Sequence, residues 1–368
     1  MEKNKSKRFL TLDVFRGLTV CLMIIVNTQG SIGTPYSALE HAEWNGCTLT
    51  DLVFPSFLFA VGNSLAFGKA KFFLLSTKDV WYKIIKRSLI IFLIGYLLSW
   101  YPFIRWNEAG EIHLKPFAET RILSVLQRIA ICYCIAAFSV YYFSKKLIII
   151  ECIIFLIGYW QILLYFGDSF APFTLKGNAV RKLDFMILGP SHMYKEKGIP
   201  FDPEGLLSTI PAIVNVLAGY LTGIFINKNG KSYYTVSYLM IIGNLLLITS
   251  LIWNVSLPFN KKLWTSSFAI YSVAIDIIVL TIIFYFIEIK KLKSGMYFFT
   301  VFGKNPLFIY VFADLIGIFL IVHVNKNIIL IDWLNLNIFQ LIAPGPFGCL
   351  LIFNFFHAYL LVSRILFG

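Results

Sequence analysis

The sequence predicts an all-α membrane protein whose chain crosses the bilayer about ten times. Of its 368 residues, 58% are hydrophobic and only 14% are charged, whereas ordinary soluble domains carry about 25% charged residues. Apolar runs of about 20 residues, the length that crosses a bilayer as a helix, recur from end to end. Aromatic residues make up 17% of the chain, which is typical of helices that face lipid and its interfaces. We therefore expect residues 1–368 to form a single transmembrane domain.

The hydrophobic runs place each expected span. Residues 328–342 are apolar but short, which predicts an interfacial or re-entrant segment. The basic N-terminus resembles a signal peptide, but Asp13 and Arg16 interrupt its apolar part and no small-residue cleavage site follows, so we expect a retained first span. The ten spans are expected at roughly 10–28, 50–68, 84–101, 122–142, 147–166, 206–226, 234–253, 265–288, 296–322 and 344–366.

Positive charge sets the expected orientation. With the N-terminus in the cytoplasm, 18 Lys and Arg lie in short cytoplasmic segments, against 11 in opposite loops that are more than twice as long. Because positive residues favour the cytoplasmic face, both termini are expected in the cytoplasm. The protein itself is expected in the inner (cytoplasmic) membrane of a cell. The net charge of +13 is spread over these loops, and we therefore expect no nucleic-acid partner. The largest loop, 167–205, is expected to fold back over the extracytoplasmic mouth.

Other motif classes are absent from the sequence. The six cysteines show no CxxC pair and lie mostly inside apolar runs, so no disulfide framework is expected. There is no GxSxG, HExxH or phosphate-binding loop, and no pair of His or Cys at metal-ligand spacing. We therefore expect no metal.

Ionisable groups inside a bilayer are costly, so they are candidate functional residues. In the first span, Asp13, Arg16 and Asn27 fall on one side of a helix, which must face the bundle. Asp13 and Arg16 either pair to neutralise each other or serve a substrate path. Asn27 either caps or cross-links helices or serves a site at the outer end.

The segment "SALEHAEWNGCTLTDLVFPSFLFAVG" leads into the second span with a histidine. His41 has Glu40 and Glu43 close on both sides, in a stretch without Lys or Arg. A histidine can take a proton from an attacking group or carry an acyl group, although a single loop histidine can equally be structural. Asp51 opens the second span as an N-cap or first-turn residue.

Two further clusters interrupt apolar runs. In "RILSVLQRIAICY", Arg121 and Arg128 are seven residues apart and so share a helix face, which either pairs with Asp13 or Asp51 or holds an anionic ligand. In "FFTVFGKNPLFIYVF", Gly and Pro predict a broken helix around Lys304 and Asn305, which frames a cavity or is a simple kink. The residues expected to line a substrate channel are Asp13, Arg16, Asp51, Arg128, Lys304 and Asn305.

Several of these stretches resemble one known family. The motifs "RFLTLDVFRGLTVCLMIIVNTQGS", "EHAEWNGCTLTDLVFPSFLFAVGNSL", "RILSVLQRIAICY", "FDPEGLLSTIPAIVNVLAGYLTG", "NKKLWTSSFAI" and "GKNPLFIYVF" are similar, in the same order, to the heparan-α-glucosaminide N-acetyltransferase family. The block from His41 to Pro55 is the most specific of them. The lumenal domain and extra first helix of the lysosomal enzyme have no counterpart, so the chain resembles the minimal bacterial form.

The resemblance implies an activity and a site. It implies an acyl-CoA-dependent transmembrane N-acetyltransferase that moves an acetyl group from cytoplasmic acetyl-CoA to the amine of an extracytoplasmic glucosamine-type sugar or glycan. It implies that His41 is catalytic, as an acetyl carrier or only as a base, with Asn27 as its partner, and it implies a homodimer. Charge and depth alone place the CoA nucleotide near Lys86 and Arg87.

Two other functions remain open on the physics of the sequence. Broken helices and intramembrane charges suit a transporter of sugar or glycan fragments equally well. A structural or assembly factor is disfavoured by the polar Asn27 and His41. Dependence on acetyl-CoA separates an enzyme from a transporter.

Overall fold

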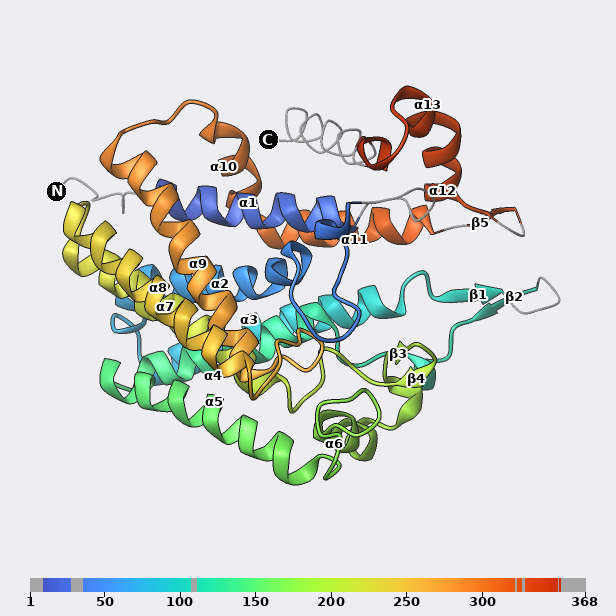
Figure 1. Ribbon diagram of the computed structural model, residues 1–368, viewed down its shortest axis with the longest axis horizontal. Helices are drawn as coiled ribbons and strands as arrows, with labels where there is room; N and C mark the ends of the chain where they lie inside the picture. The colour runs from blue at the N-terminus through green and yellow to red at the C-terminus, as the bar shows by residue number, and fades with distance from the viewer. Residues whose placement is uncertain are drawn as a thin grey trace.

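The computed structural model describes residues 9–27, 36–106, 111–321, 323–325, 328–349 and 351, and it shows a bundle of long helices (Figure 1). The long helices follow the expected spans closely, because each begins and ends where the apolar run does. Their bounds are α1 Leu10–Asn27, α2 Leu49–Phe72, α3 Thr77–Trp100, α4 Val125–Tyr142, α5 Lys145–Phe166, α7 Thr209–Asn229, α8 Tyr233–Asn254 and α9 Ser266–Phe284, the last extended by a π-helical turn Tyr285–Ile289.

The membrane-spanning character of the bundle is clear from these helices. Seven of them are long and apolar enough to cross a bilayer, and a bent pair, α10 Met296–Lys304 with α11 Pro306–Leu320, brings the number to eight in the described part of the chain. The expected third span, 84–101, corresponds to the later part of α3, which ends one residue earlier, at Trp100. The first half of α3 is too charged for the helix to be counted with the seven. The expected tenth span, 344–366, lies mostly outside the described residues. The protein is thus an all-α, multi-pass membrane protein.

The segment expected to be interfacial is short and irregular. It comprises strand β6 Ile328–Ile329, helix α12 Leu330–Leu334, a π-helical turn Asn335–Phe339 and helix α13 Gln340–Ile342. The three helical pieces follow one another without a break over Leu330–Ile342, and these 13 residues span about 20 Å, too short to cross a bilayer. Strand β5 His323–Asn325 pairs with β6.

The connections between helices alternate between the two ends of the bundle. Short turns of a few residues join α2 to α3, α4 to α5 and α7 to α8 at one end, on the left in Figure 1. The longer segments 36–48, 101–106, 111–124, 167–208 and 255–265 gather at the other end, which we call the loop end. The sequence predicts this division of short and long connections.

The loop end is covered by small elements. It carries the hairpin β1 Ile104–Trp106 and β2 Ile112–Leu114, the hairpin β3 Lys195–Glu196 and β4 Ile199–Pro200, and helix α6 Ala179–Leu188. The segment 167–208 folds back over this end, as expected. It is joined there to the histidine segment by a 2.7 Å hydrogen bond that the indole N–H of Trp44 donates to the carbonyl of Phe173. Trp44 also packs edge-on against Phe201.

Glycines allow α2 and α7 to approach within backbone contact. A Cβ on Gly62 would lie 1.8 Å from the carbonyl oxygen of Val216, and one on Gly219 would lie 2.0 Å from that of Phe59. Each helix therefore contributes a glycine to the same crossing, the small-residue packing that holds helices together in lipid. This crossing fixes α2, the helix that follows His41.

A second glycine contact fixes the broken helix. The α10–α11 pair bends by 86° at Asn305, which confirms the break that Gly303 and Pro306 predict. A Cβ on Gly17 of α1 would lie 1.8 Å from the carbonyl oxygen of Phe299, and one on Gly303 would lie 1.8 Å from that of Asp13. Helix α10 is thus held across α1, and α11 continues toward the loop end (Figure 1).

Candidate functional site

The strongest polar constellation at the loop end is a histidine paired with a buried aspartate. His41 Nδ1 lies 2.7 Å from Oδ1 of Asp51, whose side chain is 1% exposed while that of His41 is 48% exposed. The second oxygen, Oδ2, accepts hydrogen bonds from the backbone N–H of Ala42 at 3.2 Å, from the N–H of Thr48 at 3.0 Å and from its hydroxyl at 3.1 Å. With that many donors on an ionised carboxylate, Nδ1 carries the proton, and Nε2 is the ring nitrogen available for chemistry.

The local sequence explains why Asp51 reaches the histidine. Thr48 is the N-cap of α2 and Asp51 its third residue, and the two close a reciprocal capping box. The single proton of the Thr48 hydroxyl is shared between Oδ2 of Asp51 and the nearer carbonyl oxygen of Glu40, at 2.7 Å. The capping box therefore ties the histidine segment onto the start of the helix. The sequence predicted Asp51 as a first-turn residue, which is confirmed, but did not connect it to His41.

The acids next to His41 in sequence do not face its ring. Glu40 and Glu43 are exposed, and the carboxylate of Glu43 lies 3.5 Å from Lys197. The carboxylate hydrogen-bonded to the imidazole is that of Asp51. Asp51 occupies that position because a helix cap, rather than the neighbouring loop residues, turns its carboxylate toward His41.

His41 and Asn27 line the same cavity. This space, which we call the histidine cavity, has a volume of about 160 Å³. Its polar lining comes from His41, Asn27, Thr50, Lys261 and Tyr310, and the rest is apolar, from Met23, Val26, Val53, Phe54, Phe57, Val125 and Ile129. Asn27 is the last residue of α1, so the end of the first helix and the loop before the second converge here.

A second cavity continues toward the opposite end of the bundle. This basic cavity, of about 330 Å³, shares Phe57 and Ile129 with the histidine cavity. Its charged lining is Arg16, Lys83, Lys86 and Arg87. A third cavity of about 330 Å³ adjoins it, sharing Lys83 and Arg87 and reaching Phe72 and Leu75. The three spaces form a row, which we call the cavity row.

The cavity row is as long as a bilayer is thick. Thr50 lines the histidine cavity and Phe72 lines the third one, and both belong to α2. At 1.5 Å per residue, the rise along α2 between them is about 33 Å. The hydrocarbon core of a bilayer is about 30 Å thick. The histidine cavity at one end and the basic lining toward the other therefore follow one another along α2, and they share the lining residues Phe57 and Ile129.

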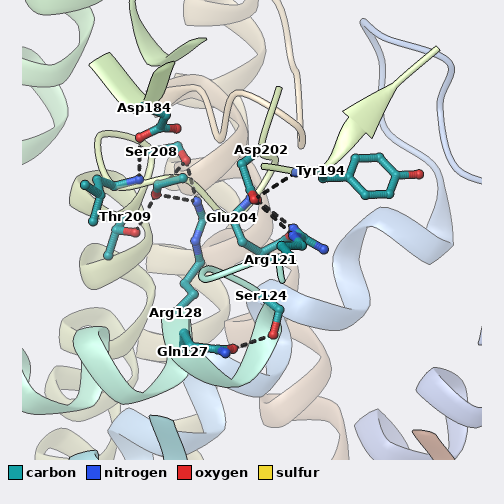
Figure 2. A network of polar contacts seen from close by, with 12 residues as sticks. Arg121, Ser124, Gln127, Arg128, Asp184, Tyr194, Asp202, Glu204, Ser208 and Thr209 are labelled. Atoms are coloured by element: carbon teal, nitrogen blue, oxygen red, sulfur yellow. Dashed lines mark hydrogen bonds and ion pairs between the residues drawn. The ribbon is translucent and has the colours of Figure 1, made fainter. Parts of the chain in front are cut away.

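The two arginines near the start of α4 hold the loop end together (Figure 2). Arg121 binds Asp202 at 2.6 Å and Glu204 at 2.5 Å. Although burial opposes it, the charges of Glu204 and Asp202 raise the pKa of the Arg121 guanidinium. Arg128 is fully buried, donates to the carbonyl of Gly205 at 3.1 Å and to the Ser208 hydroxyl, and lies over the Trp264 ring.

These partners differ from those suggested by the sequence. The pairing acids come from 202–204, not from Asp13 or Asp51, because the segment 167–208 folds over the start of α4. Arg121 also lies outside the helix, which begins at Val125 after an extended Ser124, so the two arginines do not share a helix face. The expectation of an anionic ligand at Arg128 stays a prediction.

The remaining predicted residues are spread along the cavity row and beside it. Asp13 and Arg16 pair within α1, which confirms that expectation, and Arg16 also lines the basic cavity. Lys304 and Asn305 are exposed at the helix break, next to Pro306, which lines the basic cavity. Lys86 and Arg87, the residues expected near the CoA nucleotide, line the basic cavity from α3.

Three lining residues were not singled out from the sequence. Lys83 adds a positive charge to the basic cavity, one helical turn before Lys86 and Arg87. Lys261 and Tyr310 come from segments more than 200 residues after His41 and reach the same cavity. Their only signals in the sequence were the motif "NKKLWTSSFAI", which contains Lys261, and the motif "GKNPLFIYVF", which contains Tyr310.

Fold and site together define an all-α membrane protein with a histidine–aspartate pair at one end of a cavity row. The sequence matches the family model described as "Heparan-alpha-glucosaminide N-acetyltransferase, catalytic" over residues 8–237, well over half of the chain. The chain belongs to this family.

Two curated proteins are similar to it, both called heparan-alpha-glucosaminide N-acetyltransferase. The one from Mus musculus is 26% identical over 84% of this chain and 54% of that protein. The one from Homo sapiens is 27% identical over 83% of this chain and 52% of that protein. The chain thus spans about half the length of the curated relatives it matches.

Proposed function

We propose that this protein is a transmembrane N-acetyltransferase that uses acetyl-CoA as donor and an extracytoplasmic amino sugar as acceptor. Family membership supports the reaction class, and the names of the curated relatives support a glucosamine-type amine. The observation that carries the proposal is the cavity row, which joins His41 to a basic lining on the far side of the bundle.

The orientation follows from charge. The short, lysine- and arginine-rich connections lie at the end opposite His41, and positive residues favour the cytoplasm. The basic cavity therefore opens toward the compartment that contains acetyl-CoA, and Lys83, Lys86 and Arg87 bind the phosphates of its nucleotide end. The slender pantetheine arm occupies the cavity row past Phe57 and Ile129 and presents the thioester to His41.

In this proposal, the histidine–aspartate pair promotes acyl transfer by general-base catalysis. The acceptor must be a neutral amine before it attacks the thioester carbonyl. His41 Nε2 takes the proton that the amine loses on attack, and Asp51 stabilises the resulting imidazolium through Nδ1–H. The sulfur of CoA then leaves and receives that proton. Asn27, which lines the same cavity, donates its amide N–H to the developing oxyanion.

Nε2 is also the atom that would carry an acetyl group in a two-step route. In that route Nε2 attacks the thioester, CoA leaves, and the amine then displaces the imidazole. Rapid acid quench of protein with labelled acetyl-CoA, in the absence of acceptor, distinguishes the routes. Label retained on wild type and lost with His41→Ala identifies the two-step route, and absence of label favours direct transfer.

The proposal is tested by acetyl transfer in vesicles. Purified protein is reconstituted with labelled acetyl-CoA on one side and a panel of glucosamine-terminated sugars on the other. We expect acetylated sugar from wild type and its loss with His41→Ala or Asn27→Ala. His113→Ala in the exposed strand β2 and Asn244→Ala on the exposed face of α8 are matched controls that should keep the activity. Wild-type rates in His41→Ala would contradict the assignment.

A carrier of sugars or glycan fragments is the second candidate. The row of cavities and the helix broken at Asn305 are the observations that favour it, since broken helices commonly frame sites in transporters. Uptake of labelled sugar into vesicles without acetyl-CoA would support a carrier. Transfer that requires acetyl-CoA supports the enzyme.

A further inference from the structure

A lysine far from His41 in sequence shares its cavity. Lys261 lies in the segment 255–265, between α8 and α9, and lines the histidine cavity together with His41 and Asn27. Among the lining residues that the structure describes, it is the only Lys or Arg in this cavity, whose remaining walls are mostly apolar.

The backbone around Lys261 is clamped to the histidine segment. The N–H of Gly46 donates to the carbonyl of Phe259 at 2.8 Å. The side chain of Asn260 donates to Oδ1 of Asn45 at 3.1 Å and accepts from the N–H of Leu263 at 2.7 Å. Trp264, at φ +51°, is fully buried and held by a hydrogen bond to Asn215. Lys261 is therefore presented from a rigid turn.

The neighbouring lysine shows what a structural role in this turn looks like. Lys262 donates to the carbonyl of Glu43 at 2.8 Å and to the carboxylate of Glu196 at 2.9 Å. It is outside the lining of the histidine cavity. The two adjacent lysines therefore differ in role. Lys262 links three loop segments, whereas Lys261 lines the cavity.

In the part of the chain that the structure describes, the ammonium of Lys261 has no anion in contact. Within the described residues, no carboxylate lies within ion-pair distance of it. Burial lowers the pKa of Lys261, the more distant charges of Glu204 and Asp51 raise it, and Arg128 and Lys262 lower it again. Its cavity neighbours are His41 and Tyr310. A partly desolvated cation without a counterion interacts strongly with a negative charge that forms beside it.

We propose that Lys261 is a further catalytic residue whose ammonium stabilises the oxyanion formed on the transferred acetyl group. This inference rests on the proposed function. When the amine nitrogen attacks, the C–N bond forms and the carbonyl π electrons move to the acetyl oxygen, which Lys261 Nζ and the Asn27 amide contact. When the C–S bond breaks, that electron pair re-forms the carbonyl, and the proton held by His41 passes to the sulfur. Acetyl-CoA and amine become amide and CoA, with no other reactant.

The test compares Lys261→Met, Lys261→Arg and Lys261→Gln with Lys262→Met in purified full-length protein. Acetyl-CoA and glucosamine are the probes, and kcat, both KM values and thermal stabilisation by CoA are measured. Loss of one oxyanion donor lowers kcat by about 10²–10³-fold in other acyl-transfer enzymes. We expect that loss for Lys261→Met, with the KM for acetyl-CoA and stabilisation by CoA unchanged. Lys262→Met should keep a near-wild-type kcat.

Each outcome decides the proposal. A kcat within threefold of wild type in Lys261→Met, or a rise only in the KM for glucosamine, would overturn it. If Lys261→Met does not fold, Lys261→Arg must be far more active than Lys261→Gln, and equal activities would overturn it. If wild type transfers no acetyl group from acetyl-CoA to any amine, the proposed function itself fails, and this inference fails with it.

Discussion

Replacing Asp51 with Asn tests the histidine–aspartate pair directly. In the wild type, one carboxylate oxygen faces His41 Nδ1 and the other accepts three hydrogen bonds from Ala42 and Thr48. An amide keeps one acceptor oxygen, which the three donors will retain, and turns its NH₂ toward the imidazole. Nδ1 must then accept, so the proton moves to Nε2, the atom that has to take a proton from the amine.

The magnitude follows from the bond that is lost. A hydrogen bond to a charged group contributes about 1.5–3 kcal/mol, and the wrong tautomer costs serine proteases about 10⁴-fold in kcat. Because His41 is half exposed and can turn, we expect a loss of about 10²–10³-fold in kcat/KM, equivalent to about 3–4 kcal/mol at 1.36 kcal/mol per decade.

The assay is acetyl transfer from labelled acetyl-CoA to glucosamine in detergent, with the melting temperature measured in parallel. Asp79→Asn is the matched control, because Asp79 occupies the same third position of α3 and bonds its N-cap Ser76 at 2.7 Å, with no histidine nearby in the cap. That control should lose a little stability and no activity. Equal activity losses in Asp51→Asn and Asp79→Asn would refute the reasoning, as would a wild-type rate in Asp51→Asn.

Three other predictions concern the donor end, pH and packing. Lys86→Ala should raise the KM for acetyl-CoA about 10- to 100-fold, because it removes a charge-assisted phosphate contact of about 1.5–3 kcal/mol. The control is Lys78→Ala, since Lys78 is exposed on the same helix outside the cavities, and it should leave steady-state kinetics unchanged. Burial raises the pKa of Asp184 to about 7 in the folded protein, above its unfolded value of about 3.9. The stability that this carboxyl contributes is therefore complete below about pH 4 and lost as pH rises through about 7. Melting curves between pH 5.5 and 8.5 should show a decline in wild type that is smaller in Asp184→Asn, and parallel curves would contradict this. Gly219→Val should unfold the α2–α7 crossing in thermal melts, because its Cβ would lie 2.0 Å from the Phe59 carbonyl, whereas Gly158→Ala, with open space around it, should be tolerated.

Much of the helical framework is predictable because each spanning helix must be apolar over the thickness of the bilayer. The limits of α1, α5 and α8 agree with the apolar runs within two residues. The break at Asn305 is also predictable, since Gly303 and Pro306 stand together in an apolar run. Helix α4 is less so, because its start depends on the extended Ser124, which apolarity does not reveal.

The site is predictable only where a local signal exists. The residues His41 and Asn27 stand out as polar groups at the ends of apolar segments, and their shared cavity follows from the fold. The pairing of His41 with Asp51 is not predictable from spacing, because a helix cap rather than proximity in sequence turns Asp51 toward the ring. The partners of Arg121 and the presence of Lys261 in the cavity depend on long-range folding of the loops, which no spacing encodes.

Phe57 and Ile129 border both the histidine cavity and the basic cavity. Their apolar side chains affect whether ions can pass between the two cavities. A hydrated ion that entered from either face would have to shed water against an aromatic ring and a branched aliphatic chain, which compensate none of that loss. The same two groups lie comfortably against a methylene chain. In the proposed reaction, these two side chains would therefore admit the pantetheine arm while opposing the passage of hydrated ions.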